Sequence, residues 1–123
     1  MIEALIFEQQ NNADWTQQLQ LNNYNASTNQ RTPRNLSGVE AKLLLVGASS
    51  AHPSLLLSTT NGLLIIPSSG DLGEMIIQVP AATMWTLTGG VYTGDCLLFL
   101  SGAVTLAFTA QLTIEAGITP PTP

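Results

Sequence analysis

The chain has 123 residues and a mass of 13.0 kDa, which is the size of a single domain. Charged residues make up only 9% of it, against about 25% in an ordinary soluble domain, and the formal net charge is −5. The three basic residues are Arg31, Arg34 and Lys42. So few cations exclude a nucleic-acid-binding surface and an electrostatic membrane contact, because both need clusters of basic side chains.

Targeting signals and disulfides are not expected. The first residues, MIEAL, have neither the basic start nor the long apolar stretch of a signal peptide. The longest apolar runs span about five residues, far short of the ~20 needed to cross a bilayer. The single cysteine, Cys96, excludes a disulfide within the chain. These features predict synthesis in a reducing cytoplasm without export.

The same composition predicts a folded chain with an unusual surface. Hydrophobic residues reach 45% and the mean hydropathy is +0.25, which is enough apolar material to build a core. The surface must then consist largely of Ser, Thr, Asn, Gln and small apolar groups, and such a surface resists association poorly. The chain is either a monomer with a neutral polar coat or a subunit whose surface is buried against others, and we favour the subunit.

Hydrophobic residues recur with a period of two along most of the chain, which indicates β-strands. The pattern is clearest from Val104 to Ile114, where apolar and polar residues alternate without interruption. Residues 22–34 between two such runs form a polar, Asn-rich loop. In chain order, the expected strands are roughly 2–7, 14–21, 39–46, 54–59, 63–67, 74–79, 91–100 and 104–114.

Turn signals separate these strands. Asn61-Gly62 predicts a type I′ hairpin between 54–59 and 63–67, because both central positions of that turn need a positive φ. Ser101-Gly102 predicts a second hairpin, between the last two strands. Residues 80–87 can form a single helical turn that starts at a proline.

Many short strands with turns every 8–12 residues predict an all-β fold, and we expect an immunoglobulin-like β-sandwich of seven to eight mostly antiparallel strands. A small barrel is the alternative. Residues 1–118 form the single sandwich domain, and 119–123 form a Pro-rich tail in polyproline geometry. The expected core consists of Trp15, Leu19, Met75, Ile77, Val104, Leu106, Phe108 and Leu112.

The residues that catalysis would require are nearly absent. His52 is the only histidine, and its position before a proline in a Ser-rich loop indicates a solvated side chain. Cys96 lies within a strand, where a buried and inert thiol is expected. Neither residue has the partners of a nucleophilic triad, and the chain has no Gly-x-Ser-x-Gly motif. We therefore expect a protein that is not an enzyme and has no catalytic residues.

Cofactor and metal sites are not expected either. Zinc needs three or four His or Cys ligands, and the chain contains two such residues in total. Residues 68–74 offer oxygen ligands for calcium but lack the spacing of an EF-hand, so a polar connection is expected there. Nucleotide-binding glycine motifs are missing.

Aromatic residues leave a sugar-binding surface open as an alternative. Trp15 is in phase with the apolar face of its strand and is expected in the core. Tyr92 opens a strand two residues after Gly90 and has the position of a corner tyrosine, whose hydroxyl ties down a loop. Trp85, in the helical turn, is the aromatic residue expected to be exposed.

The order of these strands and turns resembles one known family. The segments that carry the resemblance are 13–15 (ADW), 34–38 (RNLSG), 42–46 (KLLLV), 57–62 (LSTTNG), 73–79 (GEMIIQV), 90–95 (GVYTGD), 102–106 (GAVTL) and 118–119 (IT). The chain is similar, over nearly its whole length, to the immunoglobulin-like domain found at the N-terminus of bacteriophage baseplate upper proteins and in small phage virion proteins.

The resemblance implies a non-enzymatic structural component of a virion, made in the host cytoplasm, without a cofactor. It implies packing against other virion proteins and copies of itself, in the tail, baseplate or fibre-attachment region. A capsid decoration protein on the phage head is the alternative, and a host-glycan-binding module ranks behind both. The expected assembly contacts are Pro120, Pro121, Pro123 and Trp85.

Overall fold

The computed structural model describes residues 3–25, 27–49, 52–67 and 73–122. Its elements are short strands joined by tight turns, with one helical turn, as the period-two pattern and the spacing of turn residues predict. In chain order they are β1 (Glu3–Gln10), β2 (Trp15–Gln20), β3 (Asn22–Asn25), β4 (Gln30–Pro33), β5 (Glu40–Gly47), β6 (Leu55–Ser58), β7 (Leu64–Ile65), β8 (Glu74–Val79), α1 (Ala81–Met84), β9 (Gly90–Leu100) and β10 (Ala103–Glu115).

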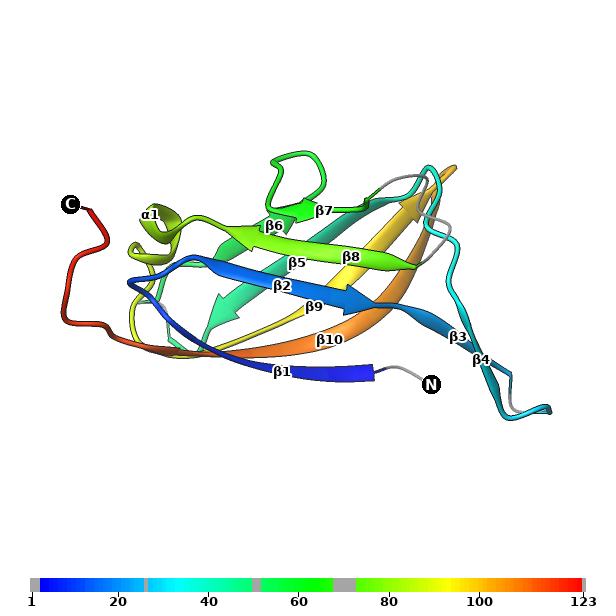
Figure 1. Ribbon diagram of the computed structural model, residues 1–123, viewed down its shortest axis with the longest axis horizontal. Coiled ribbons are helices and arrows are strands. Elements are labelled where there is room, and N and C mark those ends of the chain that lie inside the picture. The colour runs from blue at the N-terminus through cyan, green and yellow to red at the C-terminus, as the bar shows by residue number, and fades with distance from the viewer. Residues whose placement is uncertain (1–2, 26, 50–51, 68–72, 123) are drawn as a thin grey trace.

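The strands form an immunoglobulin-like sandwich, which confirms the predicted fold class (Figure 1). A five-stranded sheet has the order β1-β10-β9-β5-β6, and a three-stranded sheet has the order β2-β8-β7. The pairing of β1 with β10 is parallel, and the other pairs are antiparallel. These two sheets face each other across one core and do not close into a barrel.

The core consists of the inward positions of both sheets, and most of its expected members are buried. Trp15 of β2 lies at its centre, and its ring meets that of Phe7 edge to face with 5.4 Å between centroids. The fully buried large side chains include Trp15, Leu36, Leu43, Leu45, Leu57, Leu64, Met75, Ile77, Met84, Tyr92, Phe108 and Leu112.

Two residues expected in the core face outward instead. The register between β9 and β10 shifts between Leu106 and Phe108, so Ala107 is an extra residue in a β-bulge. A bulge of one residue reverses which side chains point inward, because the side-chain period of a strand is two. Val104 is therefore 55% exposed and Leu106 is only half-buried, so the prediction was wrong for both.

The two predicted hairpins have different outcomes. Ser101 and Gly102 have φ values of 50° and 84° and join β9 directly to β10, which confirms the second hairpin. Asn61-Gly62 does not form a type I′ hairpin, because only Gly62 of the pair has a positive φ. The turn instead carries the chain from β6 in the larger sheet to β7 in the smaller one. The side chain of Asn61 stabilises this crossover by accepting hydrogen bonds from the Ser58 and Leu63 amides.

The Asn-rich segment is not a loop as predicted but adds two strands. β3 and β4 pair only with each other and form a two-stranded arm that projects from one end of the sandwich (Figure 1). All four side chains of β4 are exposed. The backbone at the base of the arm is fixed to the sandwich, because Leu21 N–H donates to the Gly73 carbonyl and Arg34 N–H donates to the Leu21 carbonyl.

The opposite end of the sandwich holds α1 and the C-terminal segment (Figure 1). The predicted helical turn is present as Ala81–Met84, and Asp14 Oδ1 accepts a 2.6 Å hydrogen bond from its first amide. The accessible surface of 7172 Å² is larger than the roughly 6,300 Å² expected for a compact monomer of this mass. The arm and the C-terminal segment extend from the two ends, and such projections give a chain more accessible surface than a compact shape would.

Candidate functional site

His52 is held between two loops, so the prediction of a solvated loop side chain was wrong. Its Nδ1 lies 2.7 Å from the Ser49 hydroxyl, and its Nε2 lies 3.2 Å from the Gly89 carbonyl. Because a carbonyl can only accept, we assign the proton to Nε2, and Nδ1 then accepts from Ser49. The ring also contacts Tyr92, with 5.7 Å between centroids, and a Cβ added at Gly47 or Gly90 would collide with it.

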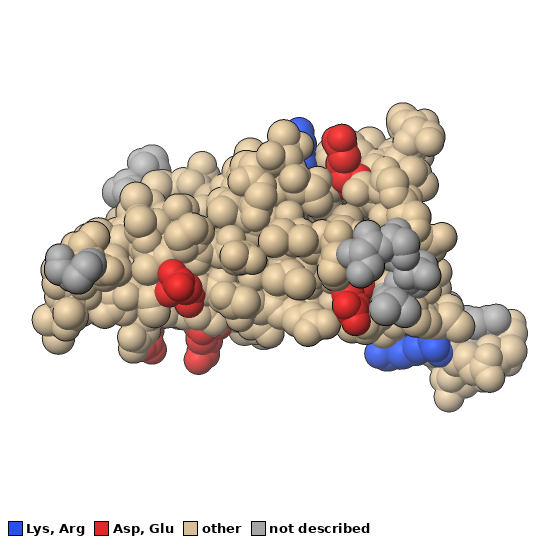
Figure 2. All heavy atoms as spheres, turned by 45° about the horizontal axis from the view of Figure 1, so that its top comes forward, with Lys and Arg blue, Asp and Glu red and all other residues tan. Residues whose placement is uncertain are grey.

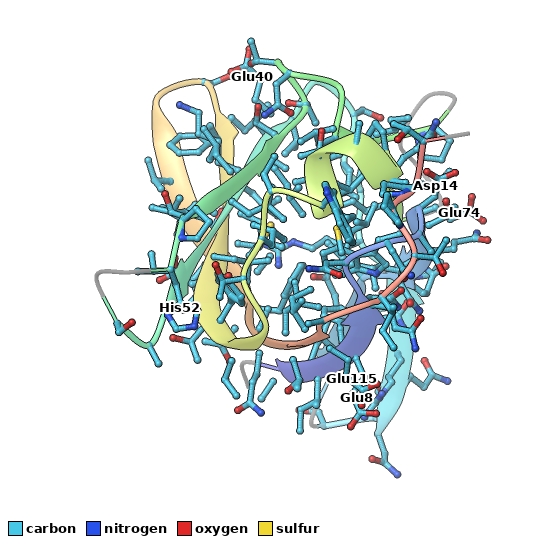
Figure 3. The ribbon with its side chains drawn as sticks, turned by 90° about the vertical axis from the view of Figure 1, so that its left-hand side faces the viewer. Glu8, Asp14, Glu40, His52, Glu74 and Glu115 are labelled. Carbon is cyan, nitrogen blue, oxygen red and sulfur yellow. The ribbon has the colours of Figure 1, made fainter. Side chains whose placement is uncertain are left out.

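This arrangement fastens the loop after β5 to the start of β9. A Ser–His pair becomes a nucleophile only when a third group orients the imidazole and donors stabilise the oxyanion. In Figure 3, His52 lies apart from every labelled carboxylate of the chain. The Nε2 atom of His52 faces the Gly89 carbonyl and not a carboxylate. Ser49 and His52 belong to the same short turn, in which the His52 N–H donates to the Ser49 carbonyl. We interpret the Ser49–His52 pair, here called the clasp, as a structural link between the loop after β5 and the segment before β9.

Cys96 lies on the inward side of β9 and is fully buried, as predicted. The pKa of its thiol is raised from 9.0 to about 12, mainly by burial and in addition by the negative charge of Asp95, while Arg34 opposes the shift. A thiol with this pKa stays protonated at neutral pH and is a poor nucleophile.

Tyr92 has the predicted role of a corner tyrosine. Its ring is buried, and its hydroxyl donates a 2.7 Å hydrogen bond to the Thr88 carbonyl, four residues upstream. Burial raises the pKa of this hydroxyl, and the hydrogen bond to Thr88 lowers it by less. Tyr92 therefore links the connection after α1 to the core rather than lining a sugar site.

The expected assembly contacts share one end of the molecule. Trp85 follows α1 and is 39% exposed, Pro120 is exposed and Pro121 is half-buried, whereas Pro123 lies outside the described residues. Figure 1 places α1 and the C-terminal segment at this end, away from the arm. The structure thus brings the described members of the set to one end of the sandwich without recording a direct contact between Trp85 and the prolines.

Two asparagines that sequence analysis did not single out hold the C-terminal segment. The buried Asn11 donates to the Leu87 carbonyl at 2.9 Å and accepts from the Gly117 amide at 2.8 Å. Asn12 donates to the Thr119 carbonyl at 3.2 Å. Beyond these bonds Ile118 is 95% exposed, so an anchored segment presents a large apolar side chain to solvent.

The most extensive unpartnered apolar surface is the outer face of the five-stranded sheet. We define the outer face as the outward side chains of β1, β10, β9, β5 and β6. A sheet face in contact with water normally carries polar residues. This face carries such residues, among them Glu8, Lys42, Asp95 and Glu115, but it also carries apolar side chains that are exposed or half-buried, namely Ile6, Leu44, Val46, Leu56, Val91, Leu97, Phe99, Val104 and Leu106.

Strand register brings many of these side chains together. Leu44 of β5 lies opposite Leu56 of β6, and Leu97 of β9 lies opposite Leu106 of β10. Lys42 lies beside Leu97 and places its ammonium 5.5 Å from the centroid of the Phe99 ring. The apolar side chains therefore form one group on β5 and β6 and another on β9 and β10. Between these groups each direct β5–β9 pair joins an apolar residue to a polar or charged one, as in Lys42–Leu97 and Leu44–Asp95.

A signal for this surface was present in the sequence. Strands buried on both faces appear as uninterrupted apolar runs instead of alternating ones. Residues 43–46 (LLLV), 55–57 (LLL) and 96–100 (CLLFL) are such runs, and they form parts of β5, β6 and β9. The runs predict a second partner for the outer side of these strands, in addition to the core on the inner side.

Charged groups are sparse on the visible surface. Figure 2 shows broad areas without acidic or basic side chains, with basic atoms beside the projecting arm. Among the described residues, no group of three or more His, Cys, Asp or Glu side chains could hold a metal ion. The calcium candidate lies largely outside the described residues, since 68–72 belong to the segment without a description. The described part of the chain contains no helix long and apolar enough to cross a membrane.

Among known proteins, the chain has distant structural likenesses only. No family model and no curated protein matches the chain. A solved structure of the NK cell receptor Nkp44, described as a triggering partner in natural cytotoxicity, is 12% identical, with a TM-score of 0.49. The match covers 94% of this chain and 99% of the receptor chain. At this identity and TM-score the likeness carries no conclusion about this chain.

Proposed function

We propose that the protein is a non-enzymatic structural component of a bacteriophage virion that works by packing against neighbouring proteins. The observation that carries the proposal is the set of apolar side chains on the outer face, since exposed Leu44, Leu56 and Val104 are less favourable in water than when a neighbouring protein covers them. The low charge of the chain fits the same role, because a subunit buried in an assembly does not depend on a charged coat for solubility.

The assignment to a phage particle rests on the sequence resemblance to immunoglobulin-like baseplate domains. The tail, baseplate or fibre-attachment region is the proposed location, and the capsid surface is the alternative. The anchored C-terminal segment with its exposed Ile118 supplies a second contact region at one end of the sandwich. A module with two separate contact regions suits a repeating assembly, in which each subunit has several neighbours.

Incorporation into particles tests this function. We expect the double variant Leu44→Ser/Leu97→Ser to be lost from purified particles by roughly tenfold or more, because it removes apolar contact area at the centre of the outer face. Ile65→Ser is the matched control, since Ile65 is a comparably exposed apolar residue on the smaller sheet. The amount of each variant in purified particles is measured by quantitative immunoblotting. Wild-type incorporation of a folded double variant would contradict the proposal.

A further inference from the structure

We propose that the free edge of β1 pairs with the free edge of β1 in a second copy of this chain, antiparallel and across a two-fold axis at Ile6. β1 is the outermost strand of the larger sheet, and among the described strands it pairs with β10 alone. Figure 1 shows it along one side of the sandwich. Its main-chain N–H and C=O groups that face away from β10 can therefore extend the sheet. The inference concerns this edge and does not rest on the proposed function of the outer face.

β1 lacks the features that normally protect a sheet edge from association. Protected edges are short, or they carry proline, lysine or a bulge. β1 has eight residues without proline, lysine or arginine, and its register with β10 runs from Glu3 to Gln10 without a shift. Its outward Ile6 is 71% exposed. A long, regular edge with an exposed apolar side chain is suited to pairing with another strand.

The other outermost strands of the two sheets are shorter or more polar. β6 has four residues and β7 has two. β2 has six, and its outward side chains are Thr16, Gln18 and Gln20. Among the described edges, β1 is thus the one on which pairing adds the most main-chain hydrogen bonds and buries the most apolar surface.

The sequence of β1 matches itself when the two-fold axis passes through Ile6. Ile6 then lies opposite its own counterpart on the outward side, and Leu5 of each copy lies opposite Phe7 of the other on the core side. Leu5 is half-buried against the core and Phe7 is nearly fully buried, so the pairing covers the margin of both cores with apolar contacts. Glu8, on the outward side, lies opposite Ala4 and not opposite a second carboxylate.

Other positions of the axis give poorer matches. An axis at Glu8 sets two carboxylates against each other, and an axis at Phe7 sets Ile6 against Glu8. An axis at Leu5 sets Phe7 against Glu3. Because a two-fold axis fixes which residues lie opposite each other, the match at Ile6 favours a second copy as the partner and selects one register.

The size of the contact predicts a weak dimer. The eight residues of β1 span about 27 Å, and two packed sheets are about 10 Å apart, so the edges share on the order of 300 Å² on each partner. A standard interface buries about 800 Å² on each partner. We therefore expect a dissociation constant between about 10 µM and about 1 mM.

A charge test at Ala4 on the full-length protein examines both the dimer and its register. Sedimentation equilibrium from about 10 µM to about 1 mM measures the dissociation constant. We expect Ala4→Lys to lower this constant by about threefold or more, because each new ammonium lies opposite Glu8 of the other copy. Ala4→Glu should raise it by a similar factor, and adding Glu8→Lys to Ala4→Glu should return it to the wild-type value or below. Ile6→Lys should raise it by about tenfold or more, since two like charges then meet at the axis.

Two controls separate this contact from other surfaces. Thr16→Lys, at an exposed position of β2, changes the net charge as Ala4→Lys does and should leave the constant unchanged. Leu44→Ser/Leu97→Ser alters the outer face and should also leave it unchanged. Amide hydrogen exchange distinguishes strand pairing from packing of faces, because alternate amides of residues 4–8 should exchange more slowly at about 1 mM than at about 10 µM. Circular dichroism establishes that each variant is folded.

The outcomes decide between this contact and its alternatives. The inference is overturned by a wild-type protein that stays monomeric up to about 1 mM, by a dimer that does not respond to Ala4→Lys and Ala4→Glu in opposite directions, or by unchanged exchange in β1. A monomeric protein whose Leu44→Ser/Leu97→Ser variant is lost from particles would remove this inference and leave the proposed function in place. A dimer with the expected charge response, formed by a chain that purified particles lack, would do the reverse.

Discussion

At the scale of single residues, the structure explains why the potential nucleophile Cys96 and the potential general base His52 have structural roles. His52 joins the Ser49 turn, the Gly89 carbonyl and the Tyr92 ring, whereas Cys96 is enclosed within the core. Sequence reasoning predicted the burial of Cys96, because a free cysteine in the middle of a strand is usually buried and inert. It missed the role of His52, since a contact between residues 52 and 89 depends on how two loops meet in space.

His52 should contribute measurably to stability. We expect His52→Ala to lower the free energy of unfolding by about 1–2 kcal/mol, since the change removes two hydrogen bonds and a ring contact. Thermal unfolding should show a decrease in Tm of about 5 °C or more. Ser54→Ala, an exposed position in the same connection, is the control and should unfold with the wild type. Equal Tm values for His52→Ala and wild type would show that the clasp contributes nothing.

Cys96 should make the protein sensitive to alkaline pH. Its pKa is raised from 9.0 to about 12 in the folded state, so above pH 9 the unfolded thiol ionises while the folded thiol stays protonated. The contribution of Cys96 to stability is therefore retained below pH 9 and lost as pH rises toward 12, with about 2 kcal/mol lost by pH ~10.5. Urea unfolding of wild type and Cys96→Ala at several pH values, under reducing conditions, measures this difference. Parallel pH profiles for the two proteins would contradict the account.

The bulge at Ala107 leads to a paired prediction. Val104→Thr should change the free energy of unfolding by less than about 0.5 kcal/mol, because Val104 points to the outer face. Phe108→Ala should cost about 3–5 kcal/mol, because Phe108 is fully buried. Urea unfolding of monomeric protein at low concentration measures both. A large loss of stability from Val104→Thr would mean that the strand keeps its uninterrupted alternation.

At the scale of elements, the sequence predicted what depends on local pattern and missed what depends on tertiary contacts. The Ser101-Gly102 hairpin and the helical turn at 81–84 follow from residues adjacent in the chain, and both are present. Asn61-Gly62 has an equally strong local signal, yet it connects two sheets, because side-chain bonds from Asn61 fix a different path. The polar segment 22–33 lacks apolar alternation because its strands pair outside the core.

The arm formed by β3 and β4 should be dispensable for folding. Replacing residues 23–32 with Asn-Gly should leave Tm within about 3 °C of wild type, because β3 and β4 pair with no strand of the sandwich. The bonds that fix Leu21 and Arg34 to the sandwich lie outside the replaced segment. Thermal unfolding followed by circular dichroism measures the effect. A loss of cooperative unfolding would show that the arm belongs to the folding unit.

At the scale of the whole molecule, three regions remain for contact with neighbours, the outer face of the larger sheet, the free edge of β1 and the end that carries Trp85 and the C-terminal segment. The prediction of assembly contacts at the prolines used the inability of proline to continue a sheet and the small entropy loss expected when a proline-rich segment docks. The outer face was not predicted, because an apolar run does not reveal which of its sides the core takes.

The C-terminal segment should act in assembly and not in folding. Deleting residues 119–123 should leave Tm nearly unchanged, since the described residues 119–122 lie beyond the last strand and their printed contact is one exposed hydrogen bond, from Asn12 to the Thr119 carbonyl. The same deletion should weaken incorporation into particles, because a proline-rich segment has few conformations and loses little entropy on docking. Particle incorporation and thermal unfolding are measured on the same preparations. Full incorporation of the truncated protein would remove the segment from the assembly contacts.

The most direct test of the virion role is the number of copies of this chain in each purified phage particle, measured by quantitative mass spectrometry against the major capsid protein. A role in the tail, baseplate or fibre-attachment region predicts a small symmetric copy number that persists through gradient purification, since closed rings set such numbers. Hundreds of copies would place the protein on the capsid surface, which is the alternative location. A chain that is expressed in infected cells but absent from purified particles would contradict the proposed function.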